Sequence, residues 1–123
     1  MILSKEKDPR LVTVRRGGTL TDADHHRLAL WAALCAEHVL PLFEPMLPGD
    51  ARPRQGIDLA RAWVRGEVKM MEARDGAFAA NAAAKDAAGS ADVAAEAARF
   101  AAYASGQAAA VGHVAGHALG AAA

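Results

Sequence analysis

Two histidines near the end of the chain, His113 and His117, are four residues apart. On a helix this spacing places both imidazoles on one face, where they could bind one metal ion. His38, beside Glu37, is a candidate third ligand. Zinc sites need three or four protein ligands, and Val114 stands where an HExxH motif has its glutamate. We therefore expect no bound metal and no cofactor. The alternative hypothesis is a small His-based metal protein or enzyme.

The chain has one thiol, that of Cys35, three residues before His38. This spacing could pair a nucleophile with a base on one helix face. Cys35 lies in an apolar stripe, however, where a thiol normally packs and stays unreactive. A single cysteine also excludes an internal disulfide and suits a reducing cytoplasm. These residues predict a cytoplasmic protein that is not an enzyme.

The charges are balanced over the whole chain but not along it. The 14 Lys and Arg residues equal the 14 Asp and Glu residues in number, which argues against binding nucleic acid through its phosphates. Residues 21–50 have a net charge of −4, and residues 51–74 have a net charge of +3. The two regions either attract each other as adjacent helices or present a recognition face to a protein partner. For that face we predict four residues: Glu44, Asp50, Arg52 and Arg54.

The stretch 101–123 has no charged residue and holds Gly112, Gly116 and Gly120 at intervals of four. About 20 residues suffice to cross a bilayer. Because this stretch is mostly Ala and Gly and carries two histidines, we expect a buried helix and no membrane span. On that helix the three glycines would form a face for close backbone contact, which could also build a homodimer. A large side chain at Gly116 should then destabilise the protein.

The first helix is predicted to begin at Thr21, a hydroxyl N-cap that precedes the acidic residues Asp22 and Asp24. Apolar residues follow at helical spacing: Leu28, Trp31, Ala32, Cys35, Val39 and Leu42. This stripe predicts the buried face of the helix. Trp31 and Trp63, each in such a stripe, are expected to anchor the core.

Proline and glycine mark the boundaries of the later helices. A loop is expected over residues 44–54, followed by a helical region over 54–88 with a break at Gly66 or near Gly76. Ser90 and Asp92 provide the capping signal for the next helix.

Residues 1–20 contain the one strand signal, Leu11, Val12 and Val14, which ends at Gly17 and Gly18. Because one strand cannot form a sheet, we expect residues 1–20 to be an extended arm that packs on the helices or on a second subunit. Residues 21–123 are expected to form a single helical domain. The predicted fold is all-α, a compact bundle of four or five helices with an extended N-terminal arm.

Three segments resemble immunity proteins of the five-like class, which are small Ala-rich helical proteins associated with bacterial polymorphic toxin systems. The segments are WAALCAEHVLPLFE (31–44), RPRQGIDLARAWVRGEV (52–68) and GHVAGHALGAA (112–122), in the same order and with similar spacing. Members of that class often continue past the equivalent of Ala123 with a Tyr-containing turn. The resemblance implies a protein that binds a cognate bacterial toxin and blocks it. No catalytic residue is carried over with it.

Overall fold

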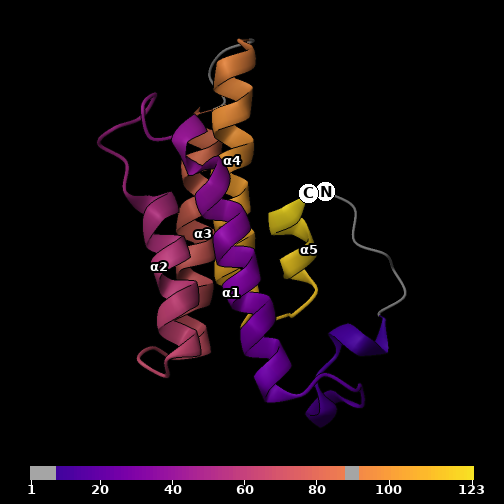
Figure 1. The fold of residues 1–123 in the computed structure, drawn as a ribbon. Helices are drawn as coiled ribbons and strands as arrows, with labels where there is room; N and C mark the ends of the chain where they lie inside the picture. Colours follow the sequence, from indigo (N-terminus) through magenta and orange to yellow (C-terminus); the bar gives the residue numbers. More distant parts are fainter. Residues whose placement is uncertain (1–7, 88–91) are drawn as a thin grey trace.

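Four long helices and one short helix make up most of the described chain, residues 8–87 and 92–123 of the computed structural model (Figure 1). They are α1 (Asp22–Val39), α2 (Arg52–Val64), α3 (Met70–Ala87), α4 (Val93–Ala110) and α5 (His117–Ala122). α4 contacts the other four helices, with α2 and α3 on one side of it and α5 on the other. This arrangement confirms the predicted all-α bundle.

α1 begins and α2 ends where the sequence predicts. The Thr21 hydroxyl accepts a hydrogen bond from the Asp24 N–H at 3.1 Å, which caps α1. α2 ends just before Gly66, whose φ of +73° lies in the left-handed region that favours glycine. α4 is capped by Asp92, which accepts from the Ala94 N–H at 3.2 Å. The predicted capping role of Ser90 lies outside the described residues.

The buried side of α1 consists mainly of alanines. Of the predicted stripe, Ala32 is buried, and Leu28 and Val39 are half-buried against the core, while the largest member is exposed. Four alanines of this helix are at most 1% exposed: Ala29, Ala32, Ala33 and Ala36. Trp31 is 42% exposed and Leu34 is 59% exposed, so the prediction that Trp31 anchors the core is wrong. α1 packs against α4, whose buried side is also mainly alanine. Small side chains on both helices allow close packing of the backbones, which leaves the larger residues outside.

Residues 8–20 form two 3₁₀ helices, η1 (Pro9–Leu11) and η2 (Val14–Arg16), instead of the predicted strand. The chain turns back on itself, so that the Leu20 N–H donates to the Val12 carbonyl at 2.9 Å. A single bridge between Thr13 and Leu20 is the one β-type pairing in the described part. The strand prediction is wrong because these backbone groups are satisfied within the segment. The first seven residues of the predicted arm lie outside the described residues.

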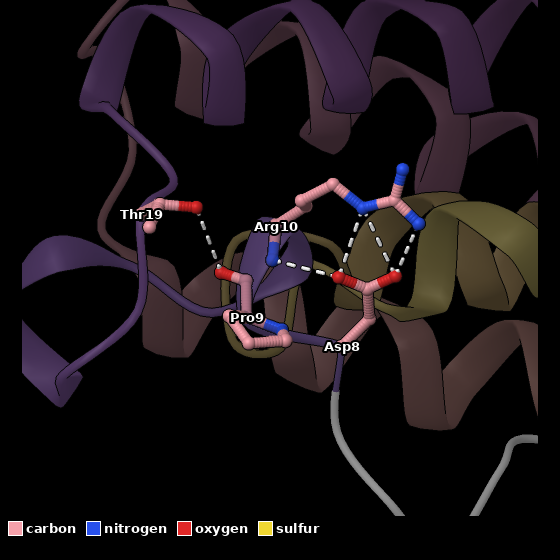
Figure 2. A network of polar contacts seen from close by, with 4 residues as sticks. All are labelled: Asp8, Pro9, Arg10 and Thr19. Atoms are coloured by element: carbon pink, nitrogen blue, oxygen red, sulfur yellow. Dashed lines mark hydrogen bonds and ion pairs between the residues drawn. The ribbon is translucent and has the colours of Figure 1, made fainter.

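Polar contacts hold the start of this segment together (Figure 2). Arg10 donates three side-chain hydrogen bonds to the Asp8 carboxylate, at 2.6 to 3.1 Å, and its backbone N–H donates another at 2.9 Å. These bonds lower the pKa of Asp8 to about 2. The Thr19 hydroxyl donates to the Pro9 carbonyl at 3.3 Å, which joins the two ends of the segment.

The uncharged stretch 101–123 is not one helix. α4 ends at Ala110, residues 111–116 form turns, and α5 runs back beside α4 and α1. Gly112 and Gly116 therefore lie in the turns and do not share a helix face with Gly120. Close packing is present at Gly112, where a Cβ atom would lie 2.9 Å from the Trp63 ring. It is absent at Gly116, where a Cβ would meet no atom within 4 Å in the described part, so the expected packing there is wrong.

Within residues 8–87 and 92–123, no helix combines the length and the apolar character that a membrane crossing requires.

Candidate protein-binding groove

An open, mainly apolar groove lies between α1, α4 and α5. Its walls are the outward side of α1, one side of α4 and the last residues of the chain: Trp31, Leu34, Cys35, His38, Val39, Leu42, Ala97, Phe100, Ala101, Ala104, Ala121, Ala122 and Ala123. Figure 1 shows the three helices that contribute to it, with α5 beside α1 and α4 and on the opposite side of them from α2. We call it the α1/α4/α5 groove.

Large apolar side chains in and beside this groove are exposed. Leu34 and Phe100 are 59% and 57% exposed, and Trp31, Leu42 and the neighbouring Leu30 are also exposed. Contiguous apolar surface of this kind marks interaction sites more often than single exposed residues do. The alanines on the inner side of α1 explain why these larger residues point outward. Sequence reasoning missed the groove because it assigned Trp31, Cys35 and Leu42 to the core.

Polar side chains are few in the groove, and one charged residue outside its lining lies against an aromatic ring of the groove. Arg99 lies 4.8 Å from the centre of the Phe100 ring and donates to Glu96 at 2.9 Å. Cys35 is half-buried, not fully buried as predicted, and His38 is exposed. No hydrogen bond joins Cys35 to His38 in the described part of the chain, so these two side chains are not paired as nucleophile and base in this structure.

The four residues predicted from charge alone bind each other and their neighbours. Arg54 donates to Glu44 at 2.6 and 2.8 Å, and Arg52 donates to Asp50 and to Asp86 at 2.6 and 2.7 Å. These bonds lower the pKa values of the Glu44 and Asp50 carboxyl groups. In Figure 1 the loop between α1 and α2 lies on the side of the bundle away from α5. Attraction between the acidic and basic regions is thus present in the fold, while partner binding by these residues stays a prediction.

The three predicted metal ligands lie in different parts of the structure. His113 is in the turns after α4, His117 begins α5, and His38 lies in the α1/α4/α5 groove. His113 and His117 therefore do not share a helix face, and that prediction is wrong because the chain turns between them. The His117 Nδ1 is 2.7 Å from the Gln107 Oε1. Residues 8–87 and 92–123 contain no cluster of three or more His, Cys, Asp or Glu side chains suited to a metal ion.

His117 should make the stability of the protein depend on pH. Its burial, assisted by nearby His113, lowers its pKa below the ordinary value of 6.5. The unfolded chain then binds more protons near this pH, so stability is full above about pH 6.5 and falls as the pH drops. His117→Gln should flatten this dependence in thermal melts between about pH 5 and pH 7. His38→Gln, at an exposed histidine, is the control and should leave the slope unchanged; equal slopes for wild type and His117→Gln would refute the assignment.

The fold and the groove define the chain as a small all-α protein with an open apolar groove between three of its helices. The family model described as "Imm-5 like putative immunity protein" matches residues 18–123, which include all five α-helices. The chain belongs to this family of immunity proteins. Comparisons with curated proteins and with solved structures gave no match.

Proposed function

We propose that this protein binds a cognate bacterial toxin through the α1/α4/α5 groove and neutralises it without turnover, in the cytoplasm. Membership of the immunity family supports a toxin as the partner. We propose this groove as the binding surface because three large apolar side chains, Trp31, Leu34 and Phe100, are exposed around it. Aromatic residues and arginine dominate the binding energy of protein interfaces, and here Arg99 lies against Phe100.

The groove is suited to one apolar segment of the toxin. Fully burying a side chain such as Leu or Phe contributes about 1.5–3 kcal/mol. Trp31, Leu34 and Phe100 could each contribute part of this amount. Arg99 lies over the Phe100 ring in the free protein, and a side chain that already has such a neighbour would lose less rotamer freedom on binding. An apolar groove with a few charged residues at its edge matches the anatomy of protein interfaces.

The charged residues Glu44, Asp50, Arg52 and Arg54 are proposed to act on encounter with the toxin. Charges outside the contact surface can still steer the approach of a charged partner, and this changes the association rate in a salt-dependent way. The double reversal Arg52→Glu and Arg54→Glu should slow association several-fold without unfolding the protein, because exposed ion pairs contribute only about 0–1 kcal/mol each. Stopped-flow association at low and high salt would measure this. An unchanged rate at low salt would exclude this face from the encounter.

The direct test of the function is co-expression with the toxin domain encoded beside the gene. The expected results are survival of the cells and recovery of a complex of the two proteins. Survival without any complex, especially if it is lost in His113→Ala or His38→Ala, would instead indicate an enzyme that removes the product of the toxin. A homodimer through the same groove is a competing outcome, which light scattering with and without the toxin would reveal.

A further inference from the structure

A second hollow lies at the end of the bundle where α1 begins, separate from the α1/α4/α5 groove. Its walls come from the N-terminal segment, the first turns of α1, Trp63 of α2, Met70 of α3 and the turns after α4. The lining residues that carry the argument are Arg15, Arg16, His25, His26, Trp63 and His113. We call it the histidine pocket, and its volume is about 630 Å³.

Cationic and imidazole side chains dominate the polar lining of this pocket. Arg15 and Arg16 come from η2, His25 and His26 from α1, and His113 from the turns after α4. Asp22 is the one carboxylate among the lining residues, and it lies 3.8 Å from Arg15. Arg16 has no ion-pair partner in the described part of the chain. The pocket therefore carries a net positive charge even when its histidines are neutral.

Two of these histidines are held in place by Trp63. The rings of His25 and His26 lie 4.9 and 5.0 Å from the Trp63 ring, measured between centroids. His25 is buried, and its Nε2 lies 2.6 Å from the Val111 carbonyl oxygen, to which it donates. The side chains around Trp63 therefore already pack against each other in the free protein. Binding of a ligand would then cost less conformational entropy.

We propose that the histidine pocket binds a tetrahedral oxyanion of the phosphate class, either free or as the terminal group of a small phosphate ester. Arg16 and His26, both among the lining residues, are its charged and polar donors. Such hydrogen bonds between ionised groups are about twice as strong as neutral ones. The site is distinct from the proposed toxin-binding groove and does not depend on that function.

Sulfate is a suitable probe of this site, because it is a tetrahedral oxyanion that keeps both of its charges between about pH 6 and pH 8. A change in its affinity therefore reports the protein and not the ligand.

The test uses the full chain carrying Trp31→Phe, so that Trp63 alone reports fluorescence. Sulfate is titrated at about pH 6 and about pH 8, with chloride at equal ionic strength as the blank. We expect saturable sulfate binding at both pH values, and we expect the Arg16→Gln substitution to weaken it several-fold. Arg99→Gln, at an arginine outside the pocket, should bind sulfate as the parent does.

Calorimetry with inorganic phosphate and with adenosine monophosphate separates the two sources of the oxyanion. If adenosine monophosphate binds more tightly than inorganic phosphate, the pocket is assigned to a phosphate ester. If it binds equally or more weakly, the pocket is assigned to the free anion. No saturable sulfate response at the lower pH would overturn the proposal. Equal responses of Arg16→Gln and Arg99→Gln would overturn it as well, because the effect would then be one of overall charge. Since Arg16 is exposed, its variant is expected to fold normally.

Discussion

Phe100→Ala is expected to weaken binding of the cognate toxin by at least 30-fold, which corresponds to about 2 kcal/mol, the threshold for an interface hot spot. Phe100 is 57% exposed in the α1/α4/α5 groove, so removing its ring should barely change the stability of the free protein. Calorimetric titration with the purified toxin domain gives the affinity, and a thermal melt gives the stability. Trp31→Ala should have a similar effect, because this side chain lines the same groove.

The chain provides a closely matched control in Phe78 of α3. This ring is 61% exposed and has an arginine, Arg74, 5.7 Å from its centre, but it does not line the groove. Phe78→Ala should therefore leave toxin binding within about twofold of wild type. Equal losses in Phe78→Ala and Phe100→Ala would place the interface elsewhere. No loss in either variant would remove the aromatic groove from the proposal.

Gly112→Ala is expected to destabilise the fold by about 1–3 kcal/mol, the usual cost of overpacking. The added Cβ would lie 2.9 Å from two atoms of the Trp63 ring, closer than real Cβ atoms approach. The ring cannot move aside easily because His25 and His26 pack against it. Urea denaturation of both proteins would measure the loss of unfolding free energy.

Gly116→Ala is the control for this prediction. It lies four residues further on, with a φ of −58° that alanine adopts freely, and its Cβ would meet no atom within 4 Å in the described part. The unfolding free energy of the Gly116→Ala variant should therefore stay close to that of the wild type. If the two variants lose the same stability, the contact of Gly112 with Trp63 does not account for the effect.

Helix boundaries were predictable because capping chemistry is local. Thr21 and Asp92 each accept a backbone N–H in the first turn of a helix, and Gly66 adopts a conformation that few other residues tolerate. The turn after Ala110 was not predictable in the same way. Its glycines are compatible with a tightly packed helix as well as with a turn, and no proline or capping residue distinguishes the two.

The orientation of α1 was predicted wrongly for a different physical reason. Hydrophobic periodicity gives most weight to large residues, and Trp31 and Leu42 therefore helped to define the expected buried side. The buried side is instead the alanine stripe, which includes Ala29 and Ala36. That second stripe is visible in the sequence. The presence of two apolar stripes on one helix, one small and one large, was the available signal for an exposed apolar surface.

The alanine core also determines which sequence changes this fold can accept. A buried alanine has only its methyl group to lose, so nearly every substitution at Ala33 or Ala102 adds atoms to a contact that has no room for them. The interior is therefore expected to vary little among descendants of this protein. Change should accumulate on the outward faces of α1 and α4, where residues such as Leu34 and Phe100 can be replaced without disturbing the packing. A lineage built on this fold could therefore change its outward surface while its scaffold stays the same.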